Sequence, residues 1–413
     1  MKFKKSTPQT EAEISEDIQK AFSINEEPTK SKKNLVFLII GIVAFLGGGA
    51  CLAVALLSPE KMLSDLTFPT LPSQPTAVDD KVYSDLTGEE LSDASLKNSP
   101  VYCIQTPNGL DGARPQTGLT DAGVVFEAIA ESGITRFAAI YQNPKNAIIG
   151  PIRSLRIYYL DWDVPFDCTI VHAGGSQEAV DAVRDYKHLS EDYAYMYRGE
   201  YGYHLWNNLF TTPGALAEYS SDYDRQSSNV SGFTRMTPEE ASKDRYTSQA
   251  EELDITAAAD YDTSSLNPEV TTIEFSFNSG DNFSPVFNYN SSTNTYDRSY
   301  AYGGIHEVYQ CPDENLYGKD PQDYCSTTQV SPSVVIAMIV DEWLSSDGVH
   351  EAMTTIGSNT AYIFQNGKAI KGAWKKDSRE SQIKFYDASG NEVALVPGQT
   401  WISAVPDYGS VDY

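Results

Sequence analysis

Arginines and one glycine-rich turn are the residues of this chain that are best suited to bind or transform a charged group. Arg114, Arg136, Arg153 and Arg156 lie among short apolar segments, although the chain has a formal net charge of −27. Arg153 and Arg156 are three positions apart in IRSLRIYYLDW, a segment with helical spacing, so they would share one helix face. Free backbone N–H groups in a first helical turn favour an anion, and a guanidinium binds phosphate or carboxylate in a bidentate way. The pattern predicts an anion site.

The turn Ala173-Gly174-Gly175-Ser176 offers a second helix start of the same kind. It joins the strand-like segment 167–172 to the helical segment QEAVDAVRDY, and strand, turn and helix in this order are typical of α/β domains. If the two helix starts are neighbours, they form one pocket for phosphate or carboxylate. The predicted ligand-binding residues of this pocket are Arg136, Arg153, Arg156, His172, Gly174, Gly175 and Ser176. The alternative is that the arginines only hold the domain together by pairing with carboxylates, of which the candidates are Glu127, Glu131, Asp161 and Asp163.

No residue of this pocket is assigned a catalytic role. His172, at the end of a strand, could act as a general base or as an anion donor, and a hydrogen-bonded structural histidine is the alternative. Ser176 is not followed by the glycine that a G-x-S-x-G nucleophile elbow requires, so we interpret it as a helix N-cap. The tyrosine-rich segment from Tyr193 to Tyr203 could stack on sugar rings or could simply pack the fold.

The cysteines predict one disulfide and no metal site. Cys311 and Cys325 bound a short polar insertion, and outside the cytoplasm they are expected to form a disulfide. Cys103 and Cys168 lie in apolar, strand-like segments, and we interpret them as separate buried thiols. With only five histidines and no C-x-x-C pair, the sequence indicates neither a metal nor a cofactor.

An unbroken apolar segment from Leu35 to Leu57 is long enough to cross a membrane. As a helix it would reach roughly 34 Å, against a hydrocarbon core of about 30 Å. Lysines lie just before it, at positions 30, 32 and 33, which predicts a single-pass protein with its N-terminus in the cytoplasm and its C-terminal domains outside. A cleaved signal peptide and a lipid on Cys51 are the alternatives to this helix.

Changes in composition along the chain predict two folded domains behind the anchor. The predicted parts are a disordered cytoplasmic tail (1–33), a transmembrane anchor (34–57), a flexible spacer rich in proline, serine and aspartate (58–98), an α/β or α+β domain (99–240), a linker (241–262) and a β-rich domain (263–408). Within the first folded domain, VVFEAIAESGITRFAAIYQ predicts a β-hairpin that turns at Ser132-Gly133.

The charge balance limits the partners of this chain. A sequence pI of about 4.4 describes a surface that repels nucleic-acid phosphates, and no basic stripe with interleaved aromatic residues compensates for it. We therefore expect the membrane as a partner through residues 35–57, an anionic small molecule or cell-wall polymer as a possible ligand, and no nucleic acid. The sequence does not indicate an oligomeric state.

Six segments resemble one bacterial family in the same order. GARPQTGLTDAGVVFEAIAESGITRFAAIYQ, IGPIRSLRIYYLDW and DCTIVHAGGSQEAV are similar to the N-terminal domain of the YerB-like lipoproteins, and NYNSSTNTYDRS, IFQNGKAIKGAWKK and GQTWISAVP are similar to their C-terminal domain. The resemblance covers roughly residues 101 to 408, and it implies an envelope protein that faces outward. It implies no activity, because none is assigned to the family.

This chain departs from the family in two places. The family usually has a cleaved lipoprotein signal, where this chain has a longer anchor. The family's His-Asn-Leu-Tyr segment is Asn207-Asn208-Leu209-Phe210 here, so a role for that histidine is not carried over, although His204 is nearby.

Three hypotheses about function follow from these residues. The first is a membrane-anchored binding protein of the bacterial envelope with an anionic ligand that bears phosphate or sugar. The second is an enzyme, a cell-wall glycopolymer phosphotransferase or hydrolase, because Ile134-Thr135-Arg136, Ile152-Arg153-Ser154 and the Gly-Gly turn resemble segments of the LytR-CpsA-Psr enzymes at the level of the fold. The third is a structural scaffold of an envelope complex.

Overall fold

The computed structural model describes residues 81–413, apart from 200–205, 245–269 and 312–315. These residues form one compact unit. The predicted tail, the anchor and the first part of the spacer lie outside the described residues, and no helix of the described part is long and apolar enough to span a membrane. Residues 81–98, which we placed in the spacer, belong to the compact unit, and Leu86 is buried in its core.

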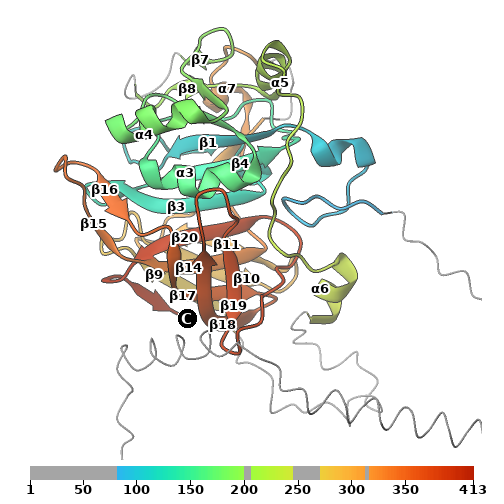
Figure 1. Ribbon diagram of the computed structural model, residues 1–413, viewed down its shortest axis with the longest axis vertical. Helices are drawn as coiled ribbons and strands as arrows, with labels where there is room; N and C mark the ends of the chain where they lie inside the picture. The colour runs from blue at the N-terminus through green and yellow to red at the C-terminus, as the bar shows by residue number, and fades with distance from the viewer. Residues whose placement is uncertain (1–80, 200–205, 245–269, 312–315) are drawn as a thin grey trace, which may run out of the picture. The chain divides into compact units, whose positions relative to one another are not determined.

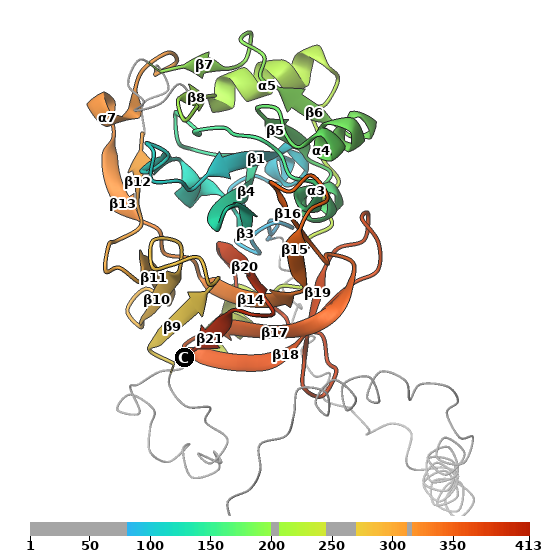
Figure 2. The same ribbon diagram turned by 90° about the vertical axis from the view of Figure 1, so that its left-hand side faces the viewer.

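A ten-stranded mixed sheet runs through both predicted domains (Figure 1, Figure 2). In spatial order its strands are β19 (Lys384–Asp387), β18 (Lys368–Lys376), β17 (Gly357–Gln365), β14 (Val334–Val340), β20 (Thr400–Pro406), β3 (Val124–Glu131), β4 (Ile134–Gln142), β1 (Val101–Pro107), β5 (Thr169–His172) and β6 (His188–Ser190). The two halves meet where β20 pairs with β3 in parallel, from Thr400 opposite Val124 to Ser403 opposite Glu127. The architecture is thus two-part and strand-rich toward the C-terminus, but the parts share one sheet.

The remaining elements are short. The other strands are β2 (Gln116–Thr117), β7 (Tyr197–Arg198), β8 (Leu209–Phe210), β9 (Thr272–Ser276), β10 (Pro285–Asn290), β11 (Thr295–Tyr300), β12 (Glu307–Gln310), β13 (Ser326–Gln329), β15 (Glu342–Leu344), β16 (Glu351–Met353) and β21 (Ser410–Asp412). The helices are η1 (Ala94–Asn98), η2 (Leu119–Asp121), α3 (Ile157–Asp163), η3 (Val164–Phe166), α4 (Gln177–Ala182), η4 (Val183–Asp185), α5 (Pro213–Asp222), α6 (Pro238–Asp244) and α7 (Pro321–Tyr324).

The β3–β4 hairpin forms as its alternating pattern predicts. Its two-residue turn is Ser132-Gly133, and both residues have positive φ, 51° and 75°, which matches the right-handed twist of the flanking strands. Alternate residues of β3 enter two different core clusters, with Phe126 in one and Val125 in the other. Both faces of the central strands are therefore buried, and this explains their nearly continuous apolar sequence.

Helix α3 covers one face of the N-terminal half of the sheet. Its buried Trp162 stacks on Phe126 with ring centroids 5.1 Å apart. The hydroxyls of Tyr158 and Tyr159 donate to backbone carbonyls of β3 and β4, at 2.6 Å to Ile129 and 2.6 Å to Arg136. The helix begins only at Ile157, so our prediction that Arg153 and Arg156 lie in its first turns is wrong.

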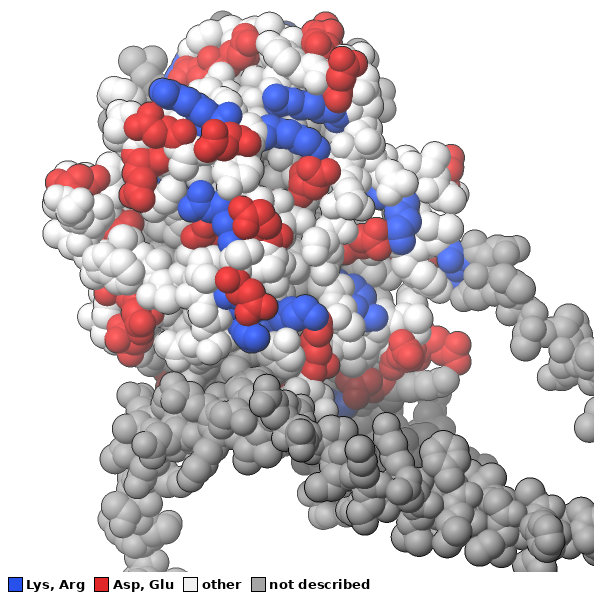
Figure 3. Space-filling model, in the orientation of Figure 1, with Lys and Arg blue, Asp and Glu red and all other residues white. Residues whose placement is uncertain are grey.

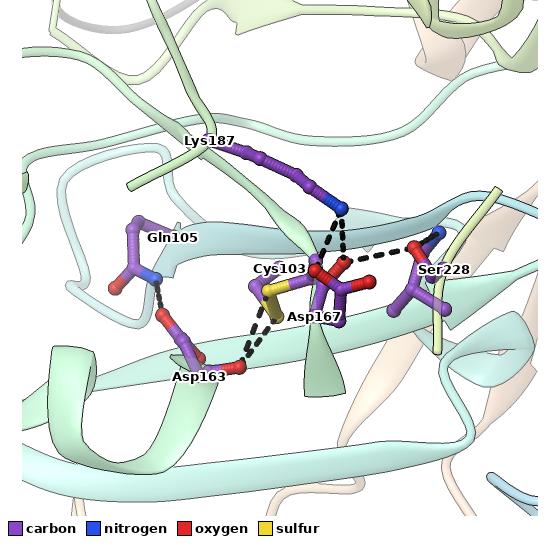
Figure 4. Close-up of a disulfide and its surroundings, with 8 residues drawn as sticks. Cys103, Gln105, Asp163, Asp167, Lys187 and Ser228 are labelled. Atoms are coloured by element: carbon purple, nitrogen blue, oxygen red, sulfur yellow. Dashed lines mark hydrogen bonds and ion pairs between the residues drawn. A yellow bond between two sulfur atoms is a disulfide. The ribbon is translucent and has the colours of Figure 1, made fainter. Parts of the chain in front are cut away.

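A disulfide joins Cys103 of β1 to Cys168, just before β5 (Figure 4). Our interpretation of these residues as separate thiols is therefore wrong, because β1 and β5 are parallel neighbours and bring the two side chains together. Asp163 packs beside the bridge and accepts from Gln105 Nε2 at 2.9 Å. Burial raises the pKa of Asp163 well above its ordinary value, although the hydrogen bond from Gln105 acts against this rise. A second disulfide joins Cys311 and Cys325.

Candidate anion site

The arginine-bearing segment and the glycine-rich turn lie side by side, although Arg153 precedes α3 by several residues and Arg156 only occupies the N-cap of that helix. The backbone N–H of Leu155 donates to the carbonyl oxygen of Gly174 at 3.0 Å, and the N–H of Ser176 donates to the carbonyl oxygen of Leu155 at 3.2 Å. A side chain at position 175 would put Cβ 2.9 Å from the same Leu155 oxygen, so the close approach requires glycine. The structure thus brings together the two segments that the sequence singled out.

Arg136 and Arg156 share one carboxylate, that of Glu131. Their guanidinium groups reach the two oxygens of Glu131 at 2.7 and 2.5 Å, and both side chains are almost fully buried. Burial raises the pKa of Glu131, but Arg136 and Arg156 outweigh this effect and hold the pKa below its ordinary value. Arg136 and Arg156 thus have the pairing role that we gave as the alternative, and their contacts with Glu131 tie β3 and β4 to the start of α3.

Arg153 differs from these two arginines. It is half-buried, its guanidinium makes no ion pair or hydrogen bond within the described residues, and its buried Nε has no partner. Burial lowers its pKa from the ordinary value, while the charges of Glu131 and Asp111 act in the opposite direction. Its backbone is fixed, because its N–H donates to Gln105 at 2.7 Å and its carbonyl accepts from Ala173 at 3.0 Å. Arg153 is thus a positioned cation that feels the carboxylates of Glu131 and Asp111 but forms no direct ion pair within the described residues.

His172 has the structural role that we gave as the alternative. Its Nδ1 donates to the Gly174 carbonyl oxygen at 2.8 Å, so the neutral ring carries a lone pair at Nε2 and cannot donate to an anion there. Burial lowers the pKa of His172 below its ordinary value, which favours this neutral form. The ring is 1% exposed, and Nε2 has no hydrogen-bond partner.

Ser176 occupies the N-cap position of α4, as predicted from the sequence, but its side chain makes no capping hydrogen bond. Helix α4 has six residues, so its dipole is small. Of the predicted set, Arg153 and the adjoining glycine-rich turn remain as groups that a ligand could reach.

Loops that follow β1 and β6 form the rim beside Arg153. Asp111 accepts from Asn207 Nδ2 at 2.9 Å, and both lie in segments for which the sequence gave no signal of a site. Arg198 pairs with Glu191 at 2.5 Å and donates to the Tyr193 hydroxyl at 3.0 Å. Tyr193 and Trp206 are 59% and 61% exposed, so aromatic faces are open at this rim. His204 lies outside the described residues.

A second arginine cluster lies at the junction of the two halves. Arg298 and Glu127 are both fully buried and form two hydrogen bonds of 3.0 Å each. Trp401 Nε1 also donates to Glu127, at 2.9 Å. His306 Nδ1 accepts from Arg298 at 2.5 Å, and its Nε2 donates to Gln116 at 3.0 Å. Burial lowers the pKa of His306 well below its ordinary value, which agrees with a neutral ring. This cluster has no access for a ligand and holds the junction.

Two clefts of the described part are lined by residues other than Arg153. One cleft of about 690 Å³ lies between residues 81–97 and 230–237, and a smaller one of about 220 Å³ lies between residues 231–234 and 382–395. Within the described residues no group of three or more His, Cys, Asp or Glu side chains could hold a metal ion.

Two family descriptions match the chain in tandem. "Protein of unknown function (DUF3048) N-terminal domain" matches residues 86–228, and the DUF3048 C-terminal domain matches residues 273–402. Together they cover more than half of the chain. The first match begins within the segment that we placed in the spacer, in agreement with the buried Leu86.

A curated relative and a solved structure match along most of the chain. "Putative lipoprotein YerB" of Bacillus subtilis (strain 168) is 28% identical over 332 residues, which are 79% of this chain and 87% of the relative. The crystal structure of YerB protein from Bacillus subtilis matches with a TM-score of 0.61 at 20% identity and covers 81% of this chain and 100% of that one. The structural match shows a shared fold, and with the two domain matches it confirms the resemblance found in the sequence. The chain belongs to the YerB-like family of DUF3048 proteins.

Proposed function

We propose that this chain is a membrane-anchored protein of the cell envelope whose folded part lies outside the cytoplasm and binds an anionic group at Arg153. The name of the Bacillus relative describes a lipoprotein, which supports attachment to a membrane. Two disulfides use four of the five cysteines, and this usage is typical of an oxidising compartment. The anchor is the apolar segment 34–57, either as a spanning helix or through a lipid on Cys51.

The observation that carries the binding proposal is the contrast between Arg153 and Arg156. Both lie in one segment of a strongly acidic chain, yet Glu131 neutralises only Arg156. Leaving a half-buried guanidinium without a hydrogen-bonded partner costs free energy, and a bound phosphate or carboxylate would reduce that cost through charge-assisted hydrogen bonds. The exposed faces of Tyr193 and Trp206 suit a sugar that carries such a group.

Thermal unfolding of the full chain in detergent, titrated with inorganic pyrophosphate, tests the proposal. A ligand that binds only the folded state must raise the unfolding midpoint. Arg153→Ala should abolish most of this rise. Arg184→Ala should preserve it, because Arg184 is an exposed surface arginine that forms a 3.4 Å ion pair with Asp181.

Two results would contradict the proposal. One is an unfolding midpoint of the unmodified chain that pyrophosphate does not raise. The other is an equal rise in the Arg153→Ala and Arg184→Ala variants, which would indicate a general effect of salt on an acidic protein.

A further inference from the structure

A two-stranded hairpin, β15–β16, projects from the large sheet beside β3 (Figure 1). Its register pairs Glu342 with Met353 and Leu344 with Glu351. Met353 is buried and holds the hairpin to the core, and a backbone bridge between His350 and Glu131 attaches β16 to the end of β3. The hairpin is thus a fixed part of the fold although it forms its own small sheet.

Large apolar side chains of this hairpin face solvent. Trp343, Leu344 and Val349 are 52%, 56% and 58% exposed. Tyr408 is 52% exposed, and its hydroxyl donates to Glu342 at 3.2 Å, so it joins the same surface. We call Trp343, Leu344, Val349 and Tyr408 the hairpin patch. Exposed tryptophan and leucine side chains that cluster on one projection are typical of an interaction surface. Burying them against a partner removes apolar surface from water, which favours binding.

The hairpin carries several acidic side chains, and its His350 pairs with Asp347 at 2.6 Å. Residues 341–357 contain no lysine or arginine. Figure 3 shows acidic and no basic side chains at the tip of this projection. The carboxylates concerned are Asp341, Glu342, Asp347, Glu351 and Asp407.

The fold disfavours the charged form of two of these carboxylates, Glu342 and Glu351. Burial and the neighbouring Glu351 raise the pKa of Glu342 to about 7. Burial and Glu131 raise the pKa of Glu351. One oxygen of Glu342 is buried without a hydrogen-bond partner. A cation placed against the hairpin would therefore relieve repulsion that the isolated chain retains.

We propose that the hairpin patch docks a protein segment that presents an apolar side chain flanked by lysine or arginine. The apolar side chain would pack on Trp343 and Leu344, and the cations would pair with Glu342 and Glu351. Anionic lipid headgroups would meet like charge at this surface, so a membrane is a poor occupant. A second copy in a two-fold dimer would bring two acidic surfaces together, which disfavours self-association through the patch.

Photo-cross-linking in the producing cells tests this docking surface. A diazirine amino acid replaces Leu344 in the full chain, and Ile305, which is 57% exposed in another part of the fold, is the matched control position. We expect position 344 and not position 305 to cross-link to one polypeptide, at a segment that mass spectrometry shows to carry lysine or arginine beside an apolar residue.

Charge reversal then separates docking from simple exposure. Glu351→Lys, added to the chain that carries the diazirine at position 344, should lower the cross-linked yield about tenfold, whereas Glu351→Gln should lower it less. Thermal unfolding of both variants checks that they fold. Adducts with lipid or with a second copy of the chain would overturn the proposal. So would equal yields at positions 344 and 305, the absence of adducts, or a yield that Glu351→Lys leaves unchanged.

Discussion

The arginine cluster at the domain junction and the corner at Arg153 differ in how their charges are neutralised. At the junction, Arg298 and Glu127 are fully buried and bind each other through two hydrogen bonds. At the corner, Arg153 is half-buried and has no counter-ion within the described residues. A buried and paired charge holds the fold, whereas a positioned and unpaired charge retains its capacity to bind a ligand.

Breaking the junction should have the largest effect on stability. Arg298→Met leaves the Glu127 carboxylate buried without a counter-charge, and we expect the free energy of unfolding to fall by about 3–5 kcal/mol. Urea unfolding of the two proteins measures this loss. The double variant Arg298→Met, Glu127→Leu should recover most of it, because no uncompensated charge then remains. A loss of less than about 1 kcal/mol in the single variant would show that the pair is not a main contact between the halves.

Glu131→Gln should have an intermediate effect, because its carboxylate is partly exposed and serves two arginines. We expect a loss of about 1–3 kcal/mol in the free energy of unfolding. Since the folded state holds the pKa of Glu131 below its ordinary value of 4.5, this contribution is fully present above pH 4.5 and is lost as the pH falls through the lower folded-state value. Unfolding curves of both proteins between pH 7 and pH 3 should therefore converge at the acid end, and a constant gap would contradict this account.

Glu342→Gln should have a smaller effect of opposite pH dependence. Burial and Glu351, together with Asp407, raise the folded-state pKa of Glu342 to about 7, although the Tyr408 hydroxyl acts against this rise. Because the folded state binds the Glu342 proton more tightly than the unfolded state does, protonated Glu342 contributes stability below pH 4.5. This contribution is lost as the pH rises through about 7. The unmodified chain should therefore lose stability relative to Glu342→Gln between pH 5 and pH 8. Parallel profiles of the two proteins would show that this carboxylate is not under strain.

Local sequence signals predicted the local structure, and contacts between distant residues decided the rest. Ser132-Gly133 marks a turn by its residue types alone, and the strand, turn and helix around Gly175 are equally local. The disulfide of Cys103 depends on β1 and β5 being neighbours, which no short segment encodes. Arg298 likewise reaches a carboxylate 171 residues away, so no local spacing could assign Glu127 to it.

The candidate site shows the same division. The sequence singled out Arg153 and Arg156 together, because they have the same type and a helical spacing. Only the structure separates them, since Glu131 forms an ion pair with Arg156 but acts on Arg153 without a direct contact. The presence or absence of a direct ion pair therefore distinguishes Arg156 from Arg153, whereas residue type and spacing in the sequence do not.

The most direct test of the central claim is isothermal titration of pyrophosphate into the full chain and its Arg153 variants. We expect Arg153→Ala to weaken binding about tenfold or more, which corresponds to about 1.4 kcal/mol, because one charge-assisted contact is lost. The affinity of Arg153→Lys should lie between that of the unmodified chain and that of Arg153→Ala, since lysine keeps the charge without the bidentate geometry. Equal affinities in all three proteins, or no measurable binding to the unmodified chain, would contradict the assignment of Arg153 as an anion-binding residue.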